Sequence, residues 1–341
     1  MPLIQGDEAT FVWRGPIAPG LVGDFNHWDE DHPLRLKAIK PGLWALSMQL
    51  PADAYIEYAY LRAGERVPDP ANLDITMNGF GELNHYFYMP GGRPAGLAQR
   101  QRGVPRGRLI RQRVPGEYTV VGGRRNVYFY QPPVSQPSPL VVVFDGQDYL
   151  RRIGLPHILD NLIHQKRIQP VALAMVANGG QARSIEYACN DATLEFLLES
   201  LLPAAREKLN LIEAGKSDGA PAKIPPDESA GSYGVLGASM GGLIALYTGL
   251  RLPHIFGNVL SQGGAFLPEY IIFDLVRLSQ VKPIKIWMDV GKYDSLHLEN
   301  QQMYALLASK GYSVMVREFN GGHNYPAWRD DVWRGLEALF G

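Results

Sequence analysis

A serine flanked by glycines stands between a predicted strand and a predicted helix. In the stretch VLGASMGGLIAL, residues 235–246, Ser239 has Gly237 two residues before it and Gly241 two residues after it. Small residues at these positions let the chain turn sharply and lift the serine hydroxyl above the end of a sheet. Because glycines are common where strands meet helices, the alternative is a purely structural turn. In this strand–turn–helix setting we interpret Ser239 as a nucleophile.

A histidine near the C-terminus could supply the base. A serine hydroxyl is a poor nucleophile until a base takes its proton, and that base is usually a histidine. His323, in FNGGHNYPAW, follows a predicted strand and precedes the last predicted helix. Loops at the carboxyl ends of parallel strands are where such sites form. We predict His323 as the base. His297 is the main rival, because it lies next to a candidate acid in the sequence.

The third member of such a set is an acid that orients the histidine and stabilises its cation. The stretch WMDVGKYDSLH places Asp289 inside an apolar strand and Asp294 in the loop after it. We predict Asp294 as the acid, because an orienting carboxylate belongs in a loop at a strand end. Asp289 and Glu299 are the alternatives.

Two backbone amides are predicted to hold the negative oxygen that forms during acyl transfer. One is the amide of Met240, which directly follows the serine. The other is the amide of Gln147, since DGQD ends a buried strand and Gly146 lets the backbone approach closely. The alternative is that DGQD is only a polar turn.

Alternating strand and helix patterns position these residues. SPLVVVFDG and PVALAMVAN are nearly continuous apolar runs, which predict strands buried on both faces. DATLEFLLESLLPAAREKL has the spacing of an amphipathic helix. Such alternation indicates an α/β domain with a largely parallel sheet and right-handed crossovers.

The N-terminal quarter has a different pattern. Residues 9–90 contain short segments rich in Val, Tyr, Phe and Trp, separated by Gly, Pro, Asp and Asn. This pattern predicts a small all-β, immunoglobulin-like sandwich. We therefore predict a β-sandwich domain over residues 1–92, a linker over 93–108 and an α/β catalytic domain over 109–341.

Composition limits the possible partners. The 341 residues carry a formal net charge of −1, which gives no electrostatic reason to expect a nucleic-acid partner. An arginine-rich stretch, RQRGVPRGRLIRQR over residues 100–113, is interpreted as a solvated linker rather than a basic patch. The histidines are scattered, with no metal-binding spacing, and the glycines around Ser239 lack the lysine of a nucleotide loop. We expect no metal and no cofactor.

The single cysteine, Cys189, rules out a disulfide within the chain, so the fold does not depend on an oxidising compartment. We interpret Cys189 as a small packed residue rather than a catalytic thiol. The N-terminus lacks the pattern of a signal peptide, and no stretch approaches the roughly 20 apolar residues that span a bilayer. We therefore expect a cytoplasmic protein with no membrane partner.

Several segments resemble the esterase-D-like family of α/β-hydrolases. The resemblance covers roughly residues 110–341, through PLVVVFDGQDYL, LGASMGGLIAL, FGNVLSQGGAF and GGHNYPAWRDDVWRGLEAL. It implies an α/β-hydrolase sheet with flanking helices and a serine carboxylic-ester hydrolase that acts through an acyl-enzyme. The segment R-x-x-E-Y…C-N, with Arg183 and Asn190, is most similar to the enterochelin (siderophore) esterase branch, as is FVWRG with DPAN.

The resemblance also implies a small-molecule ester substrate of the aryl or catecholate type. Members of that branch usually carry a serine and aromatic residues after SQ, whereas SQGGAF has Gly264 and a single Phe266. The acyl pocket is therefore expected to differ, with Arg183, Asn190 and Phe266 as candidate substrate-binding residues.

The alternative is a feruloyl or acetyl esterase that acts on plant polysaccharide. Its N-terminal domain would bind carbohydrate through GDFNHWDE and the aromatic residues Trp13, Trp28 and Trp44. The competing interpretation is that these rings fill the sandwich core or an interdomain contact. Edge strands of the sandwich could also mediate a homodimer.

Overall fold

The structure is a computed structural model that describes residues 1–78, 81–214, 230–267 and 269–341. These residues form two compact units. The first unit comprises Met1–Pro94, Val290–His297 and Glu318–Ala327, and the second comprises Ala95–Asp289, Leu298–Arg317 and Trp328–Gly341. The predicted domain boundaries stay predictions. The first unit includes two late segments that no sequence pattern linked to the N-terminal strands.

The first unit contains two antiparallel sheets. One has the strand order β1-β2-β6-β5, and the other has the order β4-β3-β7-β10-β9 with β8 paired to β7. The strands are β1 (Leu3–Gln5), β2 (Glu8–Arg14), β3 (Gly20–Gly23), β4 (Leu34–Arg35), β5 (Lys37–Lys40), β6 (Leu43–Gln49), β7 (Tyr55–Arg62), β8 (Glu65–Val67), β9 (Ile75–Met77) and β10 (Leu83–Tyr88).

Side chains from both sheets share one core, which confirms the predicted sandwich. Phe11 of β2 lies 5.0 Å from Tyr58 of β7 and 5.8 Å from Phe87 of β10, measured between ring centres. All three rings are buried. Edge-to-face packing of this kind adds to the stabilisation that burial of the rings provides.

The second unit is built on one sheet of eight strands. Their order is β11-β12-β14-β13-β15-β16-β17-β18, and the pairs from β14 through β13, β15 and β16 to β17 are parallel. The strands are β11 (Arg108–Pro115), β12 (Arg124–Gln131), β13 (Leu140–Val143), β14 (Ala172–Val176), β15 (Tyr233–Ala238), β16 (Phe256–Gln262), β17 (Lys285–Gly291) and β18 (Ser313–Phe319). Every residue of β13, β14 and β15 is buried, as their continuous apolar runs predict.

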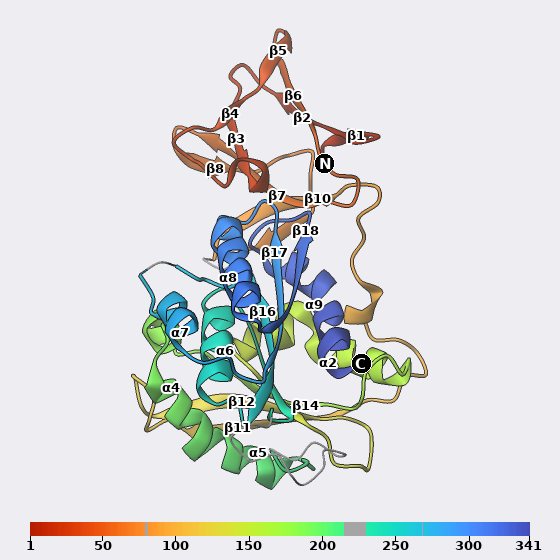
Figure 1. The fold of residues 1–341 in the computed structure, drawn as a ribbon. Helices are drawn as coiled ribbons and strands as arrows, with labels where there is room; N and C mark the ends of the chain where they lie inside the picture. The colour runs from red at the N-terminus through yellow and green to blue at the C-terminus, as the bar shows by residue number, and fades with distance from the viewer. Residues whose placement is uncertain (79–80, 215–229, 268) are drawn as a thin grey trace. The chain divides into compact units, whose positions relative to one another are not determined.

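Helices lie on both sides of this sheet, with α6 on one side and α2 and α9 on the other (Figure 1). The helices are α1 (Gly146–Asp148), α2 (Leu155–His164), α3 (Arg183–Tyr187), α4 (Asp191–Phe196), α5 (Leu202–Lys208), α6 (Met240–Arg251), α7 (Ile272–Leu278), α8 (His297–Lys310) and α9 (Tyr325–Phe340). A parallel sheet covered by helices on both faces confirms the predicted α/β-hydrolase architecture.

The arginine-rich stretch is only partly a connecting segment. Its second half, from Arg108 onward, belongs to the edge strand β11, which pairs with β12. The expectation of a solvated linker over all of residues 100–113 was therefore wrong for Arg108–Arg113.

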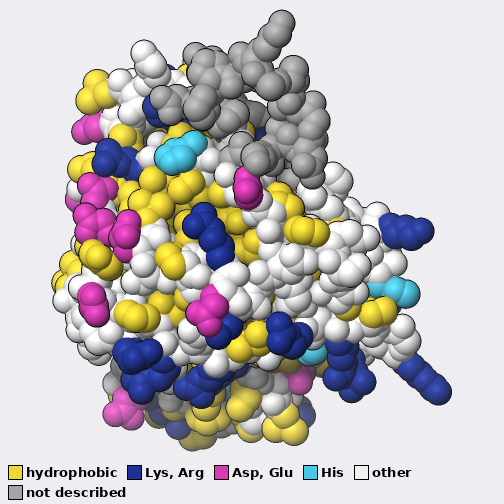
Figure 2. Space-filling view, turned by 90° about the horizontal axis from the view of Figure 1, so that it is seen from below, with side chains coloured by type: hydrophobic (Ala, Val, Ile, Leu, Met, Phe, Trp, Pro, Cys, Tyr) yellow, Lys and Arg dark blue, Asp and Glu magenta, His cyan; other side chains and the backbone are white. Residues whose placement is uncertain are grey.

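The face seen in Figure 2 shows lysine and arginine side chains interspersed with acidic and hydrophobic ones.

The tryptophans of the first unit are engaged in packing. Trp13 is buried and lies 5.1 Å from Tyr60 between ring centres. The Arg66 guanidinium lies 4.9 Å from the ring centre of Trp28, and the indole nitrogen of Trp44 donates to the carbonyl of Gly15 at 2.9 Å. These contacts favour the interpretation that the three rings serve packing. They disfavour the alternative, in which the rings bind carbohydrate.

Within the described part of the chain, no helix has the length and apolar character needed to cross a bilayer.

Candidate active site

Ser239 sits on a strained turn between β15 and α6. Its backbone has φ 58° and ψ −125°, a conformation that costs a residue with a side chain about 1–3 kcal/mol. The turn is held in place because the Ser239 amide donates to Gln262 of β16 and the Ser239 carbonyl accepts from Ala265. The side chain of Ser239 is half-buried. This geometry is that of a nucleophile elbow.

The glycines beside the serine are required by close backbone approach. A Cβ at Gly237 would meet the carbonyl oxygen of Gly241 far inside van der Waals contact, and a Cβ at Gly242 would lie 2.5 Å from Ser261 Oγ. The turn therefore brings the start of α6 directly against the end of β15. The amide of Met240 lies in the first turn of α6, where helix amides have no acceptor within the helix.

The loop after β13 has the same kind of tight geometry. Asp145 has φ 53°, and a Cβ at Gly146 would overlap the backbone of Met175 on β14. Gln147 lies in the first turn of α1, and its side chain oxygen accepts from the Asn178 amide at 3.1 Å. These contacts fix the loop that carries the Gln147 amide, the second predicted oxyanion donor.

Arg183 is held by a carboxylate that sequence reasoning missed. Its Nε donates to Asp145 Oδ1 at 2.7 Å and its second nitrogen donates to Oδ2 at 2.6 Å. Asp145 is fully buried, and it also accepts from the side chain of Asn178 at 2.7 Å. The Arg183 guanidinium thus ties the loops after β13 and β14 together. This role differs from the predicted contact with substrate.

The other two predicted substrate-binding residues also have structural partners. The Asn190 side chain caps α4 by accepting from the Ala192 amide at 2.9 Å. Phe266 has no exposed surface and belongs to the hydrophobic core of the second unit. Helix capping and core packing account for the observed positions of both residues, and their contact with substrate stays a prediction.

The predicted base and acid are paired within the first unit. His323 Nδ1 lies 2.8 Å from Asp294 Oδ2. Asp294 is buried and its Oδ1 accepts from the Leu296 amide at 2.8 Å, whereas the side chain of His323 retains 29% of its exposed surface. A buried carboxylate that accepts from Nδ1 fixes the tautomer and leaves Nε2 as the basic nitrogen.

The rival residues have other partners. Asp289, in the second unit, accepts from the indole of Trp287 at 3.1 Å and from Gln262 at 3.2 Å. Burial, followed by the charge of Asp331, raises the pKa of Asp289. His297 Nε2 lies 2.9 Å from Glu318 Oε1. The geometry therefore favours Asp294 over Asp289, and His323 over His297.

Cys189 is a packed residue, as the sequence indicates. It is buried, and its burial raises the pKa of the thiol to about 12. A thiol with so high a pKa is almost entirely protonated at neutral pH, so it is unsuited to nucleophilic attack.

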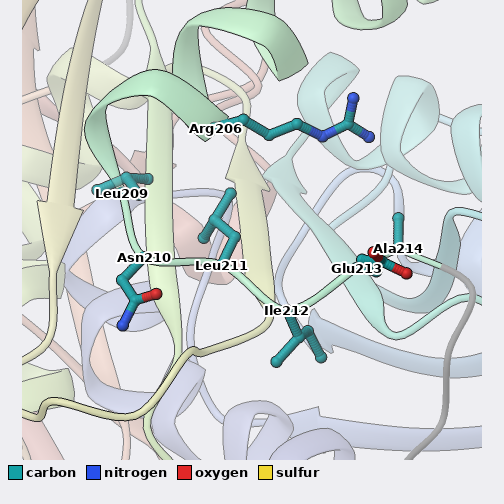
Figure 3. A pocket seen from close by; sticks show the side chains of 7 residues that line it. All are labelled: Arg206, Leu209, Asn210, Leu211, Ile212, Glu213 and Ala214. Carbon is teal, nitrogen blue, oxygen red and sulfur yellow. The ribbon is translucent and has the colours of Figure 1, made fainter.

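A pocket of about 600 Å³ lies away from Ser239 in the second unit. It is formed by the end of α5 and the segment that follows this helix (Figure 3). In this segment, the carbonyl of Ile212 accepts from the Tyr233 hydroxyl at 2.7 Å. Tyr233 begins β15 and Ser239 follows its end, so the pocket lies at the amino ends of the parallel strands. It is lined by Arg206, Leu209, Asn210, Leu211, Ile212, Glu213 and Ala214.

A serine elbow at the carboxyl end of a mostly parallel, helix-covered sheet defines an α/β-hydrolase. Residues 119–339 match the model of the family described as "Putative esterase". This match spans more than half of the chain, and the chain belongs to that family and is a carboxylic ester hydrolase.

Known proteins are similar over different shares of the chain. An iron(III) enterobactin esterase from Escherichia coli K12 is 24% identical over 98% of this chain and 91% of its own length. The crystal structure of a ferric enterobactin esterase from Salmonella typhimurium has a TM-score of 0.77 at 23% identity, covering 97% of this chain and 93% of that chain. A ferulic acid esterase structure has a TM-score of 0.56 at 14% identity and covers only 69% of this chain.

Proposed function

We propose that this chain hydrolyses esters of catecholate-type siderophores through an acyl-enzyme formed on Ser239. The observation that carries the acyl-enzyme is the strained serine elbow, in which a Cβ at Gly237 would overlap the backbone of Gly241. The substrate class rests on the extent of similarity, since the enterobactin esterase aligns with almost the whole chain and the ferulic acid esterase with 69% of it.

In the proposed reaction, Ser239 Oγ attacks the ester carbonyl while His323 Nε2 takes the hydroxyl proton. Asp294 accepts from Nδ1, keeps the imidazole in the required tautomer and stabilises its cation. The amides of Gln147 and Met240 hold the negative oxygen of the tetrahedral intermediate. The intermediate collapses and the alcohol leaves with the proton from His323. Water then attacks the acyl-enzyme, giving up its proton to His323, and the carboxylic acid product is released as the serine regains its proton.

A panel of esters tests the substrate class. The panel contains p-nitrophenyl acetate, methyl ferulate and a catecholate siderophore ester. We expect kcat/KM for the siderophore ester to exceed that for methyl ferulate by at least about tenfold, which corresponds to about 1.4 kcal/mol of transition-state binding. A preference for methyl ferulate would contradict the proposed substrate and favour the polysaccharide alternative.

Substitution of the serine tests the mechanism. Ser239→Ala is expected to lower kcat by about 10⁴-fold or more, since loss of an attacking serine leaves only residual catalysis. Ser309→Ala, on the exposed face of α8, is the matched control and should keep the activity. A fluorophosphonate probe should add to Ser239 in the unmodified protein and not in Ser239→Ala. Full turnover by Ser239→Ala would refute the mechanism.

A cytoplasmic site of action is part of the same proposal. The chain has a single cysteine, so its folding does not need an oxidising compartment.

A further inference from the structure

The two segments that carry Asp294 and His323 are built into the sandwich of the first unit. The amide of Tyr55, at the start of β7, donates to the Asn320 carbonyl at 3.0 Å. The Asn320 side chain donates to Asp53 at 2.6 Å, and the ring of Tyr293 packs against the sandwich core. The loop before His323 is thus attached to residues of the β-sandwich that are distant from it in the sequence.

One buried carboxylate touches this loop directly. Asp24 lies in the 3₁₀ turn η1 (Asp24–Asn26), within the GDFNHWD stretch that the proposed reaction does not use, and is 2% exposed. Its Oδ1 accepts from the indole of Trp28 at 3.0 Å, and its Oδ2 accepts from the Glu57 amide at 2.8 Å. A Cβ at Gly322 would lie 2.2 Å from Oδ1 of Asp24, far inside van der Waals contact. The carboxylate therefore rests against the backbone of the residue that precedes His323.

Contact with Asp24, and not the backbone conformation, leaves no room for a side chain at Gly322. Its φ lies outside the left-handed region that favours glycine, so an alanine could adopt the same backbone conformation. The preceding residue is Gly321, whose amide donates to Phe319 and whose carbonyl accepts from Tyr293. Two consecutive glycines give a loop little stiffness of its own, so its position depends on contacts from outside.

Asp24 occupies a position that is unfavourable for a carboxylate. Burial raises the pKa of Asp24, and the nearby charges of Glu57 and then Asp294 raise it further. Groups held in such an environment are concentrated at functional sites. Asp24 lies against Gly322, the neighbour of His323, so its carboxylate is in the same part of the first unit as the pair formed by Asp294 and His323.

We propose that Asp24 is a positioning residue that sets the location of His323 by supporting the backbone of Gly322. This inference rests on the proposed function, because the position of His323 matters to the reaction only if His323 is the base. It makes the N-terminal sandwich part of the catalytic machinery, for small esters as well as for large ones.

A double-mutant cycle tests the contact. Gly322→Ala places a methyl group on the carboxylate and is expected to lower kcat for p-nitrophenyl acetate by about 100-fold, because displacements near 1 Å can cost that much. Asp24→Ala removes the support and is expected to lower kcat by about 10-fold. In the double variant the methyl group occupies the vacated space, so kcat should return to within about 10-fold of the unmodified enzyme. KM should stay within about threefold throughout.

A second buried carboxylate of the same sandwich provides the matched control. Asp69 accepts from the Tyr58 hydroxyl. Asp69→Ala should lower the melting temperature as much as Asp24→Ala does, yet leave kcat of the folded protein unchanged. Circular dichroism of each variant establishes that the comparison is made between folded proteins.

The outcomes separate this inference from the proposed function. If Gly322→Ala keeps full kcat, or if the double variant loses the product of the two single losses, Asp24 does not position His323. Full activity of Ser239→Ala or His323→Ala would instead refute the proposed reaction, whatever the cycle gives. A large loss in Gly322→Ala that the second substitution restores supports the inference.

Discussion

Replacing Arg183 by glutamine removes the guanidinium that neutralises Asp145. The Asp145 side chain is 1% exposed and that of Arg183 is 27% exposed, so the pair is largely shielded from water. Removing one partner of a buried pair costs about 3–5 kcal/mol, because the remaining charge is left uncompensated. The partial exposure of Arg183 and the remaining hydrogen bond from Asn178 reduce this figure to about 2–4 kcal/mol.

The same substitution should lower kcat with little effect on KM. Asp145 precedes the loop that carries the Gln147 amide, and its Oδ2 would lie 3.1 Å from a Cβ at Gly241 beside the serine. Loss of a whole oxyanion donor costs about 10²–10³ in kcat, so a displaced donor should cost about 10-fold. Arg183→Gln therefore weakens the folded state and the chemical step together.

Urea unfolding and p-nitrophenyl acetate kinetics measure the two effects. Arg251→Gln is the control, because its pair with Asp191 is 3.5 Å long and exposed, and should change stability by less than about 1 kcal/mol. The double variant Arg183→Gln, Asp145→Asn should recover part of the stability, since neither amide leaves a buried charge. Unchanged stability with a raised KM would refute this reasoning and return Arg183 to the role of a substrate-binding residue.

Three further outcomes follow from the elbow, the thiol and a buried carboxyl. Gly237→Ala should lower kcat by about 100-fold, because the overlap with Gly241 forces a shift of roughly 1 Å. Gly234→Ala is the control: the atom nearest to its Cβ is the end of the Phe340 ring at 2.8 Å, and kcat should stay within about threefold. Because its burial raises the pKa of Cys189 to about 12, a thiol reagent at neutral pH should label Cys189 only in urea, and rapid labelling of the native protein would contradict its buried position. Because burial raises the pKa of Asp289 in the folded state, its stabilising contribution is full below about pH 4 and is lost as the pH rises through the folded pKa. Asp289→Asn should therefore flatten the decline of the melting temperature above pH 4, and an unchanged slope would show that another group causes it.

Local pattern was enough to predict the serine turn and the architecture around it. Continuous apolar runs identify β13 and β15 because burial on both faces leaves a signal in consecutive residues. Gly237 identifies the elbow because a Cβ there would overlap the backbone of Gly241, and this constraint acts between near neighbours in the sequence. The choice of Asp294 over Asp289 as the acid stays a prediction, and it depends only on which carboxylate lies beyond the end of β17.

The roles of charged and aromatic side chains could not be predicted from local sequence patterns in the same way. Arg183 carries a family-like motif, yet its partner Asp145 lies 38 residues away at the end of another strand. Phe266 follows SQGG, where a pocket residue would be expected, but tertiary packing buries it completely. A side chain's role depends on what the fold places around it, and no residue spacing in the sequence encodes that.

The first unit combines N-terminal and C-terminal segments of the chain, and this affects how the function of the sandwich can be tested. The hydrogen bond between Asn320 and Asp53 joins residues 267 positions apart. A local sequence pattern therefore cannot predict that the loop of His323 packs with the N-terminal strands. Deleting the sandwich would remove Tyr55 and Asp24 from that loop along with any surface that binds substrate. A truncated chain that lost activity would therefore not show that the sandwich recognises the siderophore. Substitutions of exposed sandwich residues that leave Asp24 and Gly322 intact separate the two roles, because only a recognition surface would change KM for the siderophore ester and spare the turnover of p-nitrophenyl acetate.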